Sequence, residues 1–331
     1  MSTTQTVPIS FVHRLLRVAE RRGFDVLPML RAAGIPADIA YRPRTRVTVE
    51  QMARVTRDLW RLTGDELFGL GPPIPLGTLK FVTLAVIHAE DLRAVGIRVA
   101  GATKVLAGVP RLKVAYGDST ARVELDVSKL DDPEHLGTEL MLALVHRLLG
   151  WLAGKRIPLR ALEFPYPSPP HAADYDKIFG CPAVFDAPVA AFEFDSALLD
   201  SPVVRSERDL EAFLGDQPGI WYATRDYGST VADQVRKILE HGLRGQWPTA
   251  EQIAARCNVS VQHLRRLLRE QDTSISEIKE EILRDAAIAS LVRGEEPVDE
   301  LAARLGFSEA SAFRRAFRRW TGSPPGAYRG E

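Results

Sequence analysis

Two short stretches near the C-terminal end decide the fold, because one repeats the other. Residues 253–260 read IAARCNVS, and residues 301–308 read LAARLGFS. The two stretches match in residue type over eight positions. Each is followed by an arginine-rich stretch whose apolar residues recur at helical spacing. The repeat indicates one structural unit that occurs twice.

Each copy has the pattern of a helix-turn-helix, in which two short helices are joined by a tight turn. Ahead of the first copy, Thr249 and Gln252 have the spacing of a capping box, so we expect a helix to begin there. Ala254 and Ala302 occupy matching positions, where a small side chain lets the second helix approach the first.

The turn and the start of the second helix also match between the copies. Asn258 and Gly306 stand where we expect the backbone to need a positive φ, which Gly adopts freely and Asn more readily than most residues. The next two positions carry an apolar residue expected to fill the space between the helices and a serine expected to cap the second helix. These residues are Val259 and Ser260 in the first copy, and Phe307 and Ser308 in the second.

The chain is neutral as a whole but carries two basic helices. Its 43 Lys and Arg balance 43 Asp and Glu, which excludes a uniformly basic nucleic-acid wrapper. Residues 260–269 contain three Arg and no acid, and residues 308–320 contain four Arg and one Glu, so each stretch has a net charge of +3. The residues expected to face the core are Leu264, Leu267, Leu268, Phe313 and Phe317. The outward faces then consist of Gln262, Arg265, Arg266 and Arg269 in the first helix, and of Ser311, Arg314, Arg315 and Arg318 in the second.

A solvated helical bundle would also carry surface arginines. That alternative does not explain why the turn, the cap and the basic face recur together, so we favour a function for the two faces.

Length and composition fit two globular domains. The chain has 331 residues, of which 45% are apolar and 26% charged. We predict a mainly α protein with a mixed α+β N-terminal domain at 10–222 and an all-α tandem helix-turn-helix domain at 229–331, with the boundary near 226–229. In the first domain we expect helices from residue 10 to about 108, a β-hairpin at 112–127, a helix at 134–154, and strands at 159–164, 183–185 and 190–194.

No targeting segment is visible, so we expect a cytoplasmic protein. Residues 1–11 lack the basic and apolar regions of a signal peptide. The most apolar long stretch, Leu140–Gly154, contains His146 and Arg147 and is too short to span a bilayer. We therefore expect no contact with a membrane.

Enzymatic and metal chemistry have weak support, so we expect no catalytic residue, no cofactor and no metal. Cys181 could act as a nucleophile with His171 as its base, but a small apolar core residue is favoured. His171, Asp174 and Asp176 could bind a metal, but a loop and helix cap is favoured. The glycine-rich nucleotide motifs and the GxSxG elbow do not occur.

The C-terminal stretch resembles the AraC/XylS family of bacterial transcription regulators. The resemblance lies in one long motif and in the helix that precedes it. The motif is Leu301-Ala302-x-x-Leu305-Gly306-Phe307-Ser308-x-x-Ser311-x-Phe313-x-Arg315-x-Phe317-x-x-x-x-Gly322-x-x-Pro325-x-x-Tyr328-Arg329, and the helix is Arg284-x-x-Ala287-x-x-x-Leu291.

Residues 10–222 are similar to the N-terminal domain of one branch of this family, often labelled arabinose-binding-like. The residues that carry the similarity are Leu76-Gly77-Thr78-Leu79, Ala85, Phe164-Pro165, His171, Tyr175, Phe179-Gly180-Cys181-Pro182, Leu199 and Pro202.

The resemblance implies a one-component regulator, more often an activator, whose two recognition helices enter successive major-groove segments. Its implied partners are double-stranded operator DNA, RNA polymerase, an unidentified small-molecule effector and a second copy of the chain. The residues implied to reach base edges or nearby phosphates are Gln262, Arg265, Arg266, Ala310, Ser311, Arg314 and Arg315. Arg269 and Arg318 are implied to contact phosphates. The alternative is an enzyme whose N-terminal domain is catalytic and whose C-terminal part anchors it to DNA. Turnover that disappears in Cys181→Ala would favour this alternative.

Overall fold

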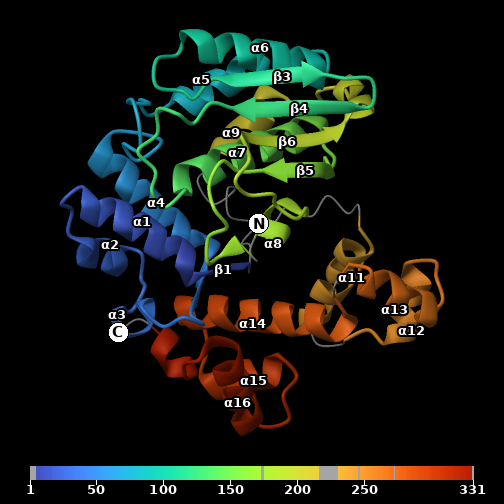
Figure 1. Ribbon diagram of the computed structural model, residues 1–331. Coiled ribbons are helices and arrows are strands. Elements are labelled where there is room, and N and C mark those ends of the chain that lie inside the picture. The colour runs from blue at the N-terminus through green and yellow to red at the C-terminus, as the bar shows by residue number, and fades with distance from the viewer. Residues whose placement is uncertain (1–4, 173–174, 216–229, 245–246, 272, 330–331) are drawn as a thin grey trace. The chain divides into compact units, whose positions relative to one another are not determined.

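The computed structural model describes residues 5–172, 175–215, 230–244, 247–271 and 273–329 (Figure 1). The chain forms two compact units. One consists of Arg57–Trp221, and the other combines Met1–Thr56 with Tyr222–Glu331. The first 56 residues therefore group with the C-terminal helices. The boundary expected near 226–229 lies outside the described residues.

The unit of residues 57–221 is built around a four-stranded antiparallel sheet with the strand order β3-β4-β6-β5 (Figure 1). In β4, alternate residues are buried, which is the pattern of a strand with one face on the core. The elements in chain order are α5 (Thr78–Val86), α6 (Leu92–Val105), β3 (Leu112–Tyr116), β4 (Thr120–Leu125), α7 (Leu136–Ala153), β5 (Leu159–Glu163), α8 (Tyr175–Phe179), β6 (Ala190–Asp195), the 3₁₀ helix η2 (Ser196–Asp200) and α9 (Glu207–Gly215).

The predicted elements of this unit are present except for one. The hairpin, the long helix and the strands at β5 and β6 are confirmed. The prediction of a strand at 183–185 is wrong, because among the described residues the strand pairing there is a single isolated bridge between Val184 and Glu163. One bridge beside the end of β5 does not extend into a ladder.

Helix α7 is the core helix of the unit. It begins at Leu136, before the apolar stretch that the sequence indicated, and its 18 residues have the length and composition of a membrane-spanning helix. In the part of the chain that the structure describes, it is the one helix of this kind, and 72% of it is buried. The burial is that of a core helix packed inside a folded unit.

The other unit combines an N-terminal helical segment with the C-terminal helices. Its N-terminal elements are β1 (Thr6–Pro8), α1 (Ile9–Arg21), α2 (Val26–Ala32), α3 (Ala37–Ala40), β2 (Arg46–Thr48) and the first half of α4 (Val49–Thr63). Its C-terminal elements are α11 (Val231–Glu240), η3 (His241–Arg244), α12 (Ala250–Arg256), α13 (Val261–Arg269), α14 (Ile275–Arg293), α15 (Val298–Arg304), α16 (Ala310–Thr321) and η4 (Pro325–Tyr328).

Asp285 in the middle of α14 ties the N-terminal strands to the C-terminal helices. The backbone N–H and the hydroxyl of Thr6 donate hydrogen bonds to its two carboxylate oxygens at 3.2 and 2.6 Å. Arg46 Nε lies 3.9 Å from the same carboxylate, and the backbone N–H of Arg46 donates to the hydroxyl of Tyr328 at 3.2 Å. β1 and β2, which pair with each other, are thereby fixed to α14 and η4.

Candidate nucleic-acid interface

The first helix-turn-helix, α12 and α13, forms as its sequence predicts. Thr249 and Gln252 make both hydrogen bonds of a capping box, and α12 begins at the next residue, Ala250. Asn258 has φ of 55° in the turn. The Ser260 hydroxyl accepts a hydrogen bond from the backbone N–H of His263 at 3.2 Å and caps α13. These local interactions fix where α13 starts and how it leaves the turn.

The second helix-turn-helix, α15 and α16, has the same turn but a different cap. Gly306 has φ of 86°. The prediction that Ser308 caps the second helix is wrong, because α16 begins at Ala310 and the residue before it is Glu309. Glu309 is extended, with φ of −140° and ψ of 140°, which delays the helix by one residue. Its carboxylate instead accepts a hydrogen bond from the Ser311 hydroxyl at 2.9 Å.

Each helix-turn-helix has its own apolar core, and both cores include part of α14. The first core contains Leu264 and Leu268 of α13 with Ile278 and Ile282 of α14. The second contains the aromatic residues of α16 with the later part of α14, and its members include Phe313, Phe317, Ala287 and Leu291. Of the predicted core residues, Leu267 is only half-buried. At 19 residues α14 is about 28 Å long, so one rigid helix carries both units (Figure 1).

A second link joins the two helix-turn-helix units beside α14. Leu243 packs against both cores. Trp247 packs against the first core, and a methyl group built on Gly306 of the second turn would lie 3.6 Å from its Nε1. The ammonium of Lys279 on α14 lies 4.5 Å from the centre of the Trp247 ring. The spacing of the two units is therefore set by side-chain packing as well as by a shared helix.

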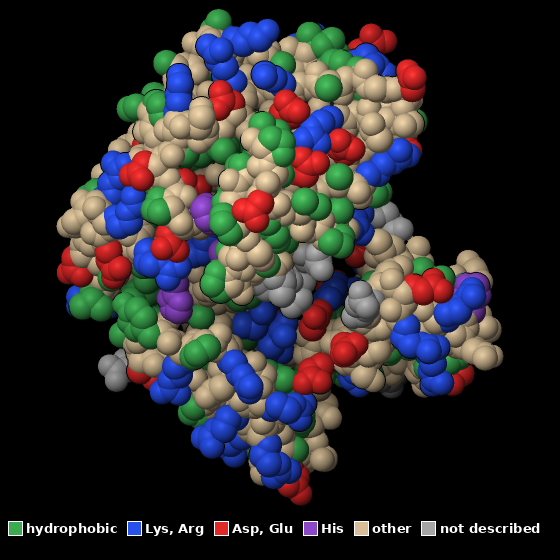
Figure 2. All heavy atoms as spheres, viewed as in Figure 1, with side chains coloured by type: hydrophobic (Ala, Val, Ile, Leu, Met, Phe, Trp, Pro, Cys, Tyr) green, Lys and Arg blue, Asp and Glu red, His purple; other side chains and the backbone are tan. Residues whose placement is uncertain are grey.

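The predicted recognition faces point to solvent. Figure 2 shows Lys and Arg side chains gathered over α15 and α16 and, separately, over α12 and α13. Ala310 is half-buried and packs against the second core, so of the proposed contact residues it offers the least surface. The other proposed contact residues are all exposed, namely Gln262, Arg265, Arg266 and Arg269 on α13 and Ser311, Arg314, Arg315 and Arg318 on α16.

The arginines of these faces differ in how far they are already paired. Arg314 Nη2 lies 2.6 Å from Asp299 Oδ1, in a pair whose side chains are 52% and 72% exposed. Arg266 Nε lies 3.8 Å from Glu270. Pairs this exposed contribute about 0–1 kcal/mol, so a phosphate can displace either carboxylate. Within the described residues, the side chains of Arg315 and Arg318 have no ion-pair or hydrogen-bond partner. Their guanidinium groups are free to bind a ligand.

Sequence reasoning missed the residue that anchors the end of α16. Glu280 on α14 accepts hydrogen bonds from the Trp320 indole N–H and from Arg319, the latter at 2.9 Å. Arg319 lowers the pKa of Glu280, mainly through that hydrogen bond. No local pattern pairs residues 280 and 320, so the sequence carries no signal for this contact. The hydrogen bond to Glu280 holds Arg319 against α14.

The residues weighed for enzymatic or metal chemistry have structural partners where they are described. His171 Nε2 lies 3.0 Å from Glu139 Oε1, the carboxylate that also accepts a hydrogen bond from the Tyr175 hydroxyl at 2.5 Å. Cys181 is buried, and its thiol lies 3.5 Å from the carbonyl oxygen of Pro182. Asp174 and the side chain of Asp176 lie outside the described residues. The described residues include no group of three or more potential metal ligands.

Two family models match the chain. The arabinose-binding domain of AraC transcription regulators, N-terminal, matches residues 23–203, and a helix-turn-helix domain matches residues 253–331. The chain is 26% identical to the ornithine utilization regulator of Pseudomonas aeruginosa, over 99% of this chain and 97% of that protein. It is 25% identical to the HTH-type transcriptional regulator VirS of Mycobacterium tuberculosis, over 93% of this chain and 91% of that protein.

Among solved structures, the transcriptional regulator CdpR from Pseudomonas aeruginosa is 18% identical, with a TM-score of 0.30, over 97% of this chain and 98% of that one.

The first family match alone covers more than half of the 331 residues. The chain belongs to the AraC family of transcription regulators, in which an arabinose-binding-type N-terminal domain is joined to a helix-turn-helix domain that binds DNA.

Proposed function

We propose that this regulator is a ligand-responsive activator, in which residues 10–222 bind a small molecule and residues 229–331 bind the operator. α13 and α16 enter successive major-groove segments on one side of the DNA. The observation that carries this proposal is the pair of exposed basic faces held by one helix, α14. Double-stranded DNA has a high density of negative charge, which such faces complement.

The contact residues have two roles in this proposal. Gln262, Arg265 and Arg266 on α13, with Arg314 and Arg315 on α16, read base edges, since Arg pairs bidentately with guanine and Gln with adenine. Arg269 and Arg318 contact phosphates and fix the register. Ala310 and Ser311 lie in the first turn of α16, next to the groove floor. Of the two base-reading arginines on α16, Arg315 has the stronger claim, because its exposed guanidinium has no partner within the described residues, whereas Arg314 pairs with Asp299.

The remaining partners follow from the same function. An activator contacts RNA polymerase, and we propose a second copy of the chain as the other protein partner. The protein then acts in the cytoplasm, where the DNA is, and without catalysis. The ornithine utilization regulator is named for control of the use of one small organic compound, and we propose control of the same kind here.

The test is binding of the full chain to operator DNA selected from random sequence by the protein itself. Arg315→Ala is expected to weaken binding about 5- to 150-fold, the equivalent of about 1–3 kcal/mol for a lost bidentate contact. Arg293→Ala is the matched control, because Arg293 is an exposed arginine of α14 that pairs with Glu295 outside both faces. Equal affinity of Arg315→Ala and the control would remove Arg315 from the contact set.

Salt dependence tests the number of contacts. The logarithm of the binding constant should fall with the logarithm of salt concentration. The slope is about −2 if Arg269 and Arg318 alone neutralise phosphates, and up to about −5 if all six arginines of the two faces do. Removing Arg318 should reduce the steepness by about 0.9. A slope that stays near zero would contradict docking by both helices.

A further inference from the structure

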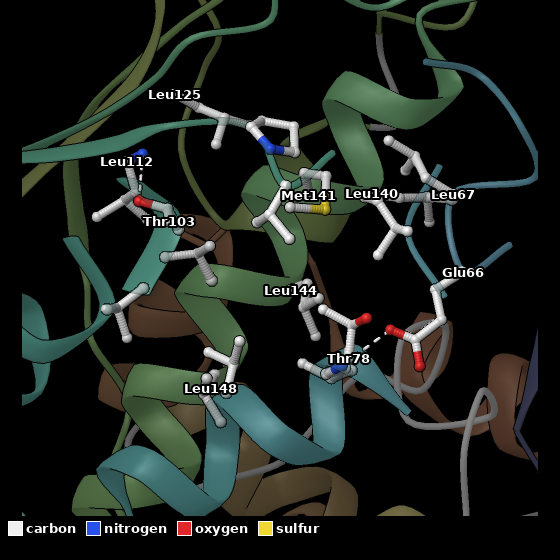
Figure 3. Close-up of a pocket in the computed structure, with 17 residues that line it drawn as sticks. Glu66, Leu67, Thr78, Thr103, Leu112, Leu125, Leu140, Met141, Leu144 and Leu148 are labelled. Atoms are coloured by element: carbon white, nitrogen blue, oxygen red, sulfur yellow. Dashed lines mark hydrogen bonds between the residues drawn. The ribbon is translucent and has the colours of Figure 1, made fainter. Parts of the chain in front are cut away.

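The unit of residues 57–221 contains a cavity between α5, α6, α7 and the sheet (Figure 3). Its volume is about 90 Å³. An apolar cavity of about 150 Å³ binds benzene, so one of this volume holds a hydrocarbon body of about four nonhydrogen atoms. The residues that line it include Glu66, Thr78, Thr103, Leu140, Met141 and Leu144.

The described walls are almost entirely apolar, and the hydroxyls of Thr78 and Thr103 already have partners. The Thr78 hydroxyl donates to the carbonyl of Pro75 at 2.6 Å. The Thr103 hydroxyl donates to the carbonyl of Ala100 at 3.2 Å and accepts from the backbone N–H of Leu112 at 3.1 Å. A sugar would bury several hydroxyls without partners in such a cavity, which is unfavourable. The walls therefore select an apolar body.

Glu66 is the charged side chain among the described residues that line the cavity. Its two carboxylate oxygens accept hydrogen bonds from the backbone N–H groups of Gly77 at 2.7 Å and Leu79 at 2.9 Å, so the carboxylate is held in one position. A carboxylate has about four acceptor sites, so two have no partner among the residues that the structure describes. Figure 3 shows Glu66 at one end of the cavity, with Leu112 and Leu125 at the other and Met141 and Leu144 between them.

Among the described residues that line the cavity, none is Lys, Arg or His, so none of them supplies a counterion for the charge at this end. Burial raises the pKa of Glu66, the two backbone N–H groups lower it, and the neighbouring carboxylate of Asp65 raises it. The site therefore lacks one positive charge. The Glu66 carboxylate would repel an anionic ligand, whereas a cationic head group would pair with it.

We propose that the effector bound in this cavity is a small apolar monoamine, with its ammonium group on Glu66 and its hydrocarbon body between α5, α6 and α7. This inference rests on the proposed function only in calling the ligand an effector. It excludes sugars, carboxylic acids and zwitterionic amino acids from the cavity, because their hydroxyls or carboxylates have no partner there.

The test is calorimetric titration of the full chain, without DNA, with butylamine, isobutylamine, butanol and butyrate. At least one of the two amines is expected to bind saturably, and butyrate at least about tenfold more weakly. Glu66→Gln should weaken amine binding by about tenfold or more, while Glu211→Gln, an exposed carboxyl of α9 in the same unit, should leave it unchanged. Leu144→Trp should abolish binding by filling the cavity.

The ligands are compared on the unaltered protein, so the result does not depend on whether a variant folds. No saturable amine binding, or butyrate binding as tightly as butylamine, would overturn it. Retention of full affinity by a folded Glu66→Gln would also overturn it. DNA binding is measured separately on the same preparation, so loss of operator binding with intact amine binding would contradict the proposed function alone.

Discussion

Truncation of Phe317 tests whether the two helix-turn-helix units have separate cores. Its side chain is fully buried, and its ring centre lies 5.2 Å from that of Tyr328 and 5.7 Å from that of Phe313. A buried Phe→Ala substitution costs about 3–5 kcal/mol, because it removes apolar contact and leaves a cavity. A domain is stabilised by only about 5–15 kcal/mol, so Phe317→Ala is expected to consume much of the stability of the second unit.

The assay is amide hydrogen exchange followed by mass spectrometry, which reports stability segment by segment. Protection is expected to fall by a factor of about 100 or more in α15, α16 and the end of α14, the equivalent of about 3 kcal/mol. α12 and α13 should change little, since Leu264 and Leu268 belong to the other core. Phe81→Ala is the control, because Phe81 is 62% exposed and its loss should change stability by less than about 0.5 kcal/mol. Equal loss of protection in α12–α13 and in α15–α16 would refute the two-core description.

Three further predictions concern the turns, the link between the units and the response to acid. Gly306→Ala should destabilise the protein by about 1 kcal/mol in urea denaturation, because φ is 86°, whereas Asn258→Gly should cost no more than a few tenths; equal effects would contradict the strain argument. Trp247→Ala should lower operator affinity more than it lowers stability, since it loosens the spacing of the units; unchanged affinity on the selected operator would contradict that role. Burial lowers the pKa of His146 to about 4 from 6.5. The contribution of the neutral imidazole to the free energy of unfolding, at most about 3 kcal/mol, is therefore present above pH 6.5 and is lost as pH falls toward 4. Urea denaturation at pH 6.5 and at pH 4 should show this loss of stability in the unaltered protein and a smaller loss in His146→Gln. The same loss in both proteins would mean that another group causes it.

Local patterns predicted what local interactions build. The capping box at Thr249, the positive φ of Asn258 and Gly306, and the outward arginines of α13 and α16 all depend on residues within a few positions of one another. The predicted cap of α16, Ser308, was wrong by one residue, because the sequence pattern is equally compatible with an extended Glu309 before the helix. The sequence was therefore sufficient for the DNA-binding units and their faces.

Contacts between residues far apart in the sequence could not be predicted from local patterns. β1 and β2 are three residues long each, and they pair across some forty positions, from Thr6 to Thr48. The hydrogen bonds of Thr6 to Asp285 join opposite ends of the chain. The cavity is lined from Glu66 to Leu148 by helices and strands far apart in sequence, so its charge and size emerge only once they pack.

Methylation interference on the selected operator tests most directly whether α13 and α16 both enter the major groove. Methyl groups on guanine N7 block major-groove contacts, and α14 fixes the separation of the two helices. Interference is predicted at two clusters of guanines on one side of the DNA, about one helical turn apart, with Arg315→Ala weakening one cluster only. A single cluster, or two that both persist unchanged in Arg315→Ala and Arg265→Ala, would contradict the tandem reading of DNA by these helices.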